Sequence, residues 1–352
     1  MKHTSKFLGA AGVFALAALG ANPAYAAGTL AGSTITNTVT VDYQVGGVAQ
    51  TATAASDTFT VDRKVNLTVA EVGTTTTQVS PGQAAAVTTF QVTNLSNAVL
   101  DFALAVAQQT GGAGAHANTD TFDATNLRIY VDTNANGTFD AGDTLVTYLD
   151  ELAADVSRTV FVVSDIPLGQ TTGAVAAVTL TATGREGGTA AAQGAALVET
   201  TTGNTAGMDT VFADGAGSTD AARDAAFSAK DDYTVSAAAI TVAKRSTLVS
   251  DPFNGTTNPT YIPGAVIEYC ISVTNAAGSA SATSVAISDP LPTEVTYLAA
   301  FGIKVDGTVN VSNVCLADGA GSGSFAGTTV SGTIATVAAS QTRTVLFRAT
   351  IN

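Results

Sequence analysis

Apolar and polar residues alternate along much of this chain with a period of two, which predicts β-strands rather than helices. Residues 33–62 (STITNTVTVDYQVGGVAQTATAASDTFTVD) alternate on both sides of Gly46-Gly47, as two antiparallel strands joined by a tight turn do. Residues 65–72 and 86–94 alternate again on either side of Ser80-Pro81-Gly82. We therefore expect an all-β fold that begins with a hairpin.

A second copy of this strand and turn pattern begins near residue 240. There AAITVAK precedes a turn at Pro263-Gly264, which leads into VIEYCISVTN and ends at Asn275. In the first copy Pro81-Gly82 leads to Asn94 with nearly the same spacing. The repeat predicts two related β-domains.

The alternation in residues 266–275 assigns side chains to two faces of a strand. It places Cys270 on the face that points away from the core, and the apolar side chains on the opposite face, namely Ile267, Tyr269, Ile271 and Val273. Cys270 and Cys315 form an even pair, for which a disulfide is expected over two free thiols if the chain is exported. The disulfide would then be a staple across the outside of the domain.

The start of the chain has the layout of a secretory signal peptide. Lys2 and Lys6 precede an apolar run, and small residues surround Tyr25 at the end of MKHTSKFLGAAGVFALAALGANPAYA. The run is too short to span a bilayer, which takes about 20 apolar residues. We expect a secreted protein, extracellular or at the cell surface, with no direct membrane insertion.

The negative net charge limits the classes of binding partner that are expected. It is -14 for the whole chain, and loss of Lys2 and Lys6 with the signal peptide would make it -16. Nucleic acid is therefore not expected as a partner, and cations such as calcium are the natural counter-species.

Residues 131–143 (VDTNANGTFDAGD) have the spacing of a calcium loop. An EF-hand-type loop takes oxygen ligands from positions 1, 3, 5, 7, 9 and 12 and has Gly at position 6. Gly137 occupies the sixth position, and the ligand positions hold Asp132, Asn134, Asn136, the carbonyl of Thr138, Asp140 and Asp143. Asp in place of Glu at the twelfth position shortens the reach and indicates weak binding, suited to extracellular calcium. The alternative is a solvated Asn-Gly turn.

Other constellations give weaker signals. The acidic residues of 208–224 lack ligand spacing and are interpreted as a polar connection in which Asp caps a short helix; they are Asp209, Asp214, Asp220 and Asp224. His116 lies in a Gly-rich loop and is expected to be solvent-exposed. Asp231 and Asp232 are neighbours on a strand and would point to opposite faces. With no nucleophile elbow and no His-Glu-x-x-His motif, no enzyme is expected.

A carbohydrate-binding face of aromatic side chains is a further alternative. Its candidates are Tyr130, Tyr148, Tyr261 and Tyr297. The absence of Trp weakens this interpretation, because Tyr at alternating strand positions is more often part of a core or sheet surface.

Residues 263–298 (PGAVIEYCISVTNAAGSASATSVAISDPLPTEVTYL) resemble the repeat of large bacterial surface proteins known as domain of unknown function 11. The shared run is a Pro-Gly turn, an alternating segment ending in Val-Thr-Asn, then Asp-Pro-Leu-Pro and Val-Thr-Tyr. The likeness covers residues 239–352 well and residues 65–190 more loosely, since these lack Asp-Pro-Leu-Pro. It implies immunoglobulin-like β-sandwiches that serve as structural modules of the cell surface, and it transfers no catalytic motif.

Together these patterns divide the chain into a signal peptide (1–26), an N-terminal β-hairpin (27–64), a first β-sandwich with the calcium-type loop (65–197), a connection (198–238) and a second β-sandwich (239–352). Within the connection, residues 220–229 (DAARDAAFSA) are expected to form a short helix. The function we expect is that of a non-enzymatic structural or adhesive surface protein whose partners are other copies of itself or other surface proteins. The alternative is a monomeric binding module for a glycan or protein ligand.

Overall fold

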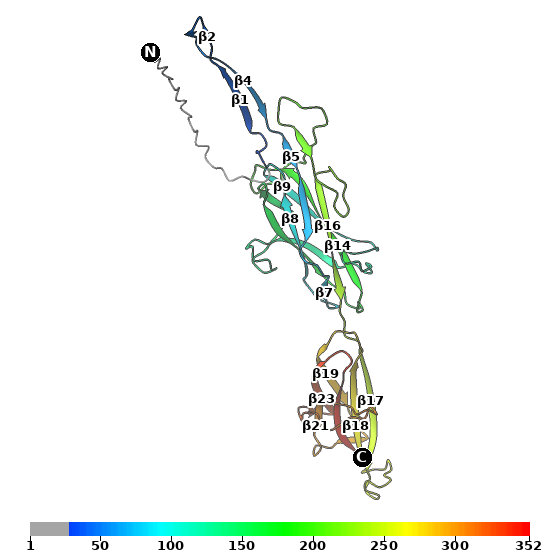
Figure 1. Ribbon diagram of the computed structural model, residues 1–352. Helices are drawn as coiled ribbons and strands as arrows, with labels where there is room; N and C mark the ends of the chain where they lie inside the picture. The colour runs from blue at the N-terminus through cyan, green and yellow to red at the C-terminus, as the bar shows by residue number, and fades with distance from the viewer. Residues whose placement is uncertain (1–27) are drawn as a thin grey trace, which may run out of the picture.

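The computed structural model describes residues 28–352, so the predicted signal peptide lies outside the described residues. These residues form 24 strands and no helix, which confirms the all-β prediction. A hairpin and two β-sandwiches follow one another along a single long axis (Figure 1). Residues 28–352 therefore contain no helix that could span a membrane.

The N-terminal hairpin is a two-stranded ribbon. Strand β1 (Thr34–Val41) pairs antiparallel with β4 (Thr53–Thr60), and the tip is formed by β2 (Gln44–Val45) and β3 (Val48–Ala49). Gly46 and Gly47 join β2 to β3 with φ of 58° and 80°, a left-handed turn that glycine adopts without strain. The turn lies where the sequence places it.

The first sandwich consists of two five-stranded sheets whose facing side chains form one core. The order of the first sheet is β11-β10-β13-β8-β6, and that of the second is β12-β9-β14-β16-β7. Large side chains fill the space between the sheets, among them Phe90, Phe102, Leu180 and Tyr233, which are fully buried. The strands are β6 (Leu67–Glu71), β7 (Thr77–Val79), β8 (Ala86–Asn94), β9 (Leu100–Gln108), β10 (Thr125–Val131), β11 (Thr144–Leu145), β12 (Tyr148–Leu152), β13 (Ser157–Asp165), β14 (Val175–Glu186) and β16 (Ala226–Val235).

The predicted helix at residues 220–229 is wrong. Asp220 and Asp224 cap turns, accepting hydrogen bonds from the amides of Gly217 and Ala221. From Ala226 the chain is strand β16, which pairs with β14 over nine residue positions. The alanines favour a helix locally, but this ladder and the burial of Tyr233 outweigh that weak preference.

The predicted connection at residues 198–238 is wrong for the same reason. Strand β15 (Thr210–Phe212) pairs in parallel with β5 (Arg63–Val65), and β16 is a central strand of the second sheet. The first sandwich thus extends to Val235. Four residues, 236–239, separate it from β17 (Ile240–Ser250) of the second sandwich.

Hydrogen bonds tie this four-residue linker to both sandwiches. Its Ala237 exchanges two hydrogen bonds with the hydroxyl of Thr172, and the Ser236 amide donates to the carbonyl of Val79. On the other side, the Ala280 amide donates to the carbonyl of Ala237 at 2.9 Å. The linker is therefore short and is hydrogen-bonded to both sandwiches.

The second sandwich packs a sheet of order β17-β18-β24-β20, with β21 also paired to β24, against a three-stranded sheet of order β19-β23-β22. Ile267, Ile271 and Val273 of β18 are buried and Tyr269 packs against the core, which confirms the predicted face. The remaining strands are β18 (Val266–Asn275), β19 (Ala282–Pro290), β20 (Val295–Tyr297), β21 (Ile303–Gly307), β22 (Ser324–Ala326), β23 (Thr329–Val337) and β24 (Thr342–Ile351).

The repeat seen in the sequence has a structural counterpart in two buried asparagines. Asn94 ends β8 and Asn275 ends β18, and both are 0% exposed. The Asn94 amide donates to the carbonyls of Ala98 and Leu152, and the Asn275 amide donates to those of Ala280 and Val337. Each asparagine therefore links the strand that it ends to the loop that follows and to a third segment of the same sandwich.

Cys270 and Cys315 form a disulfide, as the sequence predicts. Cys270 lies opposite Arg245 and Leu346 in the sheet register, on the face away from the core, and Cys315 comes from the loop after β21. Arg245 also donates a hydrogen bond to the carbonyl of Asn313 in that loop. The disulfide thus fastens a long loop to the outer face of the sheet.

Candidate functional site

The polar loop of residues 131–143 joins β10 to β11 at the edge of the first sheet. Asp132 is buried to 6% exposure, and its two oxygens accept hydrogen bonds from the amides of Asn136 and Gly137 at 3.2 and 2.8 Å. Asp143 accepts from the amides of Thr133 and Asp140. These two carboxylates hold the loop backbone in place.

Three of the six predicted ligand residues meet through their side chains. The amide nitrogens of Asn136 and Asn134 donate to Asp140, at 2.7 and 3.2 Å. Thr138 donates its backbone amide to Asn136. Hydrogen bonds from the Gly142 amide, Asn136 and Asn134 hold the pKa of Asp140 below its ordinary value, so its carboxylate is ionised at neutral pH.

This donor set fits calcium in composition. Asp140 supplies an ionised carboxylate. The side-chain amides of Asn134 and Asn136 donate to this carboxylate through their nitrogens, and each also carries an oxygen that could bind calcium. Those oxygens accept from the Asn136 and Thr138 amides instead. Because calcium takes only oxygen ligands, both amide groups must turn over for a cation to bind beside Asp140.

The second acidic stretch is engaged with backbone. Asp209 accepts from the Thr205 amide, and Asp214 accepts from the amides of Asp224 and Ala225. These bonds shape the loops that lead into β15 and β16. Asp caps are therefore present, as the sequence suggests, but they cap turns rather than a helix.

A different cluster unites residues that sequence spacing does not connect. Glu71 at the end of β6, His116 in the loop after β9, and Asp231 of β16 place their ligand atoms within 4.8 Å of one another. Within residues 28–352, they are the only group of three His, Cys, Asp or Glu side chains this close. Asp232 adjoins them through His116.

The predicted solvent exposure of His116 is wrong. Its side chain is 16% exposed, with Nε2 3.1 Å from Glu71 Oε1 and Nδ1 3.0 Å from Asp232 Oδ1. Its backbone amide also donates to Asp232 Oδ2 at 3.0 Å. The loop closes this tightly because residue 114 is glycine: a Cβ there would lie 2.6 Å from Asp232 Oδ2.

The cluster has an excess of negative charge in a desolvated place. Burial raises the pKa of Asp231 to about 7. The negative charges of Glu71 and Asp232 also raise this pKa, whereas the hydrogen bond from the Asp232 amide lowers it. Burial lowers the pKa of His116, but the hydrogen bond to Asp232 and the charges of the three carboxylates raise it above its ordinary value overall. The imidazole is the only group among them that can carry a positive charge.

The four tyrosines proposed for a carbohydrate face lie on separate elements. Tyr130 on β10 packs edge-on against Phe139 with ring centroids 4.9 Å apart, and Tyr297 on β20 stacks on Phe325. Tyr148 lies on β12 in the other sheet of the first sandwich, while Tyr261 is 62% exposed in a loop of the second. They do not gather into one face.

No family model matches this chain, and no curated protein matches it. Among solved structures it is similar to the CupB6 tip adhesin from Pseudomonas aeruginosa, at 11% identity and a TM-score of 0.27, covering 83% of this chain and 87% of that one. It is also similar to a protein described as membrane anchored from Corynebacterium diphtheriae, at 11% identity and a TM-score of 0.20, covering 91% and 89%. At these TM-scores neither structure bears on the function of this chain.

Proposed function

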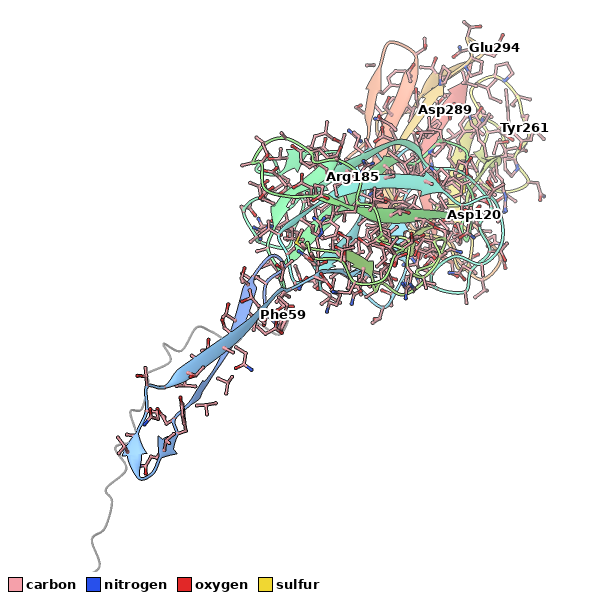
Figure 2. The ribbon with its side chains drawn as sticks, turned by 90° about the horizontal axis from the view of Figure 1, so that it is seen from above. Phe59, Asp120, Arg185, Tyr261, Asp289 and Glu294 are labelled. Carbon is pink, nitrogen blue, oxygen red and sulfur yellow. A yellow bond between two sulfur atoms is a disulfide. The ribbon has the colours of Figure 1, made fainter. Side chains whose placement is uncertain are left out.

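We propose that this protein is an exported, non-enzymatic structural or adhesive component of the cell surface or extracellular matrix, which assembles with copies of itself through its N-terminal hairpin. The observation that carries the proposal is the hairpin itself. It projects from the first sandwich with neither face covered (Figure 2). An isolated two-stranded ribbon is marginally stable in water, so such a projection is expected to gain a partner.

The two faces of the hairpin differ in chemistry. Cross-strand neighbours Ile35 and Phe59 share one face with Val39 and Val41, and all four are at least 37% exposed. The opposite face carries hydroxyl groups, from Thr34, Thr36, Thr38, Thr40, Ser56, Thr58 and Thr60. Strands β1 and β4 also leave both outer edges of the ribbon without a partner strand among the described residues, which suits β-augmentation.

The base of the hairpin is held firmly. Arg63 forms a bidentate ion pair with Glu186 and donates to the hydroxyl of Thr210. Asn97 donates to the carbonyls of Thr29 and Asp62. The ribbon is therefore presented in a fixed direction, which lowers the entropic cost of docking it.

The acceptor we propose is the open side of the second sandwich, between the edge strands β17 and β19. A groove of about 300 Å³ lies there over Ile271 and Val273, and Val242 beside it is 65% exposed. The charged residue of β17 in this groove, Lys244, already forms an ion pair with Asp289 at 2.7 Å. Donor and acceptor therefore match in their apolar character.

The hairpin lies at one end of the elongated chain, and strands β17 and β19, which flank the groove, belong to the sandwich at the other end (Figure 1). A contact between hairpin and groove therefore joins one copy to the next head to tail. Such a heterologous contact builds rings or open filaments. We expect filaments of the full chain by negative-stain electron microscopy, and monomers for Val39→Ser with Phe59→Ser. The matched control, Thr36→Ala with Thr58→Ala on the hydroxyl face, should still polymerise.

A mixing experiment tests the acceptor. Val242→Asp should block the groove and leave the hairpin intact. Mixed with the Val39→Ser, Phe59→Ser variant, it should form a one-to-one dimer, measured by light scattering, since one donor and one acceptor remain. Unchanged polymers in either variant would contradict the proposal, and a wild-type chain that stays monomeric would favour the binding-module alternative.

We also propose that the loop of residues 131–143 binds calcium weakly. Calcium at about ten times its dissociation constant should raise the melting temperature by about 3 °C, since it binds only the folded state. Asp140→Asn should abolish this increment; melting in chelator gives the baseline for each variant, because Asp140 also accepts hydrogen bonds within the loop. Asp57→Asn in the hairpin is the control. A calcium increment that survives in Asp140→Asn would refute the assignment.

A further inference from the structure

The cluster at Glu71, His116 and Asp231 has the composition of a transition-metal site. It offers one imidazole nitrogen and two carboxylate oxygens, all within 4.8 Å of one another. Ligand atoms bound to one tetrahedral zinc ion lie roughly 3.3 Å apart, given bond lengths of about 2.0 to 2.2 Å. The ligand atoms would therefore have to move together by about 1.5 Å at most.

The orientation of His116 is already fixed as metal sites require. Asp232 holds Nδ1 and the backbone amide of His116, at 3.0 Å each, and is itself 0% exposed. This leaves Nε2 facing Glu71. A carboxylate on the far nitrogen of a ligating imidazole fixes the tautomer and strengthens the ligand.

The charge of the cluster is unbalanced. Three carboxylates face one imidazole, and within residues 28–352 none of the three forms an ion pair with Lys or Arg. Asp231 is 3% exposed and Asp232 is 0% exposed, so water does not screen them. Buried carboxylates are costly unless a cation or a proton neutralises them.

From these observations we propose that Glu71, His116 and Asp231 bind a first-row divalent cation, with Asp232 orienting the histidine. The imidazole favours zinc and its neighbours over calcium or magnesium, which prefer all-oxygen sites. Glu71 and His116 are partly exposed, so a water molecule can complete the coordination. The ion ties together the end of β6, the loop after β9 and strand β16.

The test is equilibrium dialysis of the full chain against Zn²⁺ at pH 7.5, after treatment with a chelator. We expect one Zn²⁺ per chain, retained in 1 mM Ca²⁺. His116→Ala should weaken binding at least about 100-fold, and Asp232→Asn about 10- to 100-fold. Asp132→Asn, in the separate polar loop, is the control that should leave binding unchanged.

Proton nuclear magnetic resonance gives an independent readout. The chain has two histidines, His3 and His116, so the imidazole signal missing from His116→Ala is that of His116. Zn²⁺ should shift that signal, whereas His3 lies in the predicted signal peptide and gives no signal once this is removed. Glu71→Gln keeps the side-chain volume and should weaken binding about 10-fold while circular dichroism in chelator stays unchanged.

Two results would overturn the proposal. One is a dissociation constant for Zn²⁺ above about 100 µM in the wild-type chain. The other is binding that persists unchanged in both Glu71→Gln and His116→Ala. Either result would leave the cluster as a hydrogen-bonded clamp that is neutralised by a proton.

Discussion

Replacing Asn275 by Asp is expected to lower the free energy of unfolding of the second sandwich by about 4 kcal/mol, because it buries a carboxylate that has no cationic partner. The Asn275 amide nitrogen donates to the carbonyls of Ala280 and Val337 at 2.8 and 2.9 Å. The oxygen accepts from the Ala239 amide and the Ser279 hydroxyl. In Asp the donating nitrogen becomes a carboxylate oxygen facing two carbonyls.

Urea unfolding, followed by circular dichroism, measures the effect. Asn313→Asp is the matched control, since Asn313 is an exposed residue of the same sandwich and its substitution should change stability by less than about 0.5 kcal/mol. A loss below about 1 kcal/mol for Asn275→Asp would mean that the site admits water or a proton at little cost.

Removing the disulfide by Cys270→Ser with Cys315→Ser is expected to destabilise the second sandwich by about 4 kcal/mol. The two cysteines are 45 residues apart, and closing a loop of that length reduces the entropy of the unfolded chain by about this amount. The midpoint of urea unfolding should fall accordingly. Wild-type protein in reductant should unfold at the same midpoint as the double variant.

Equal stability of the oxidised and reduced wild-type chains would contradict this prediction. It would show that the loop after β21 keeps its place without the covalent bond, through contacts such as the hydrogen bond from Arg245 to Asn313.

Patterns local to one strand predicted the fold well. The period of two identified both faces of β18, and the Gly46-Gly47 turn located the hairpin, because pleating and turn geometry are set by neighbouring residues. The prediction was wrong at residues 220–229, where composition favoured a helix. Pairing with β14, which is distant in sequence, determines that segment instead.

The two candidate metal sites differ in how far the sequence could reveal them. The loop of residues 131–143 is continuous, so its spacing was visible, although the roles of Asp132 and Asp143 as backbone caps were not. Glu71, His116 and Asp231 belong to three segments that only the fold brings together. A lone histidine two residues after a glycine, with two adjacent acids far downstream, gives no spacing signal.

The course of β16 bears on how the molecule responds to mechanical force. When the hairpin and the second sandwich are pulled apart, the force acts on the first sandwich through the C-terminal end of β16. This strand runs along the long axis toward the linker (Figure 1). Hydrogen bonds of an antiparallel ladder lie perpendicular to the strands. The nine residue pairs between β14 and β16 are therefore loaded in shear, all together, rather than unzipped in turn. A filament of such molecules would therefore withstand a pulling force until the whole β14–β16 ladder of a first sandwich breaks at once.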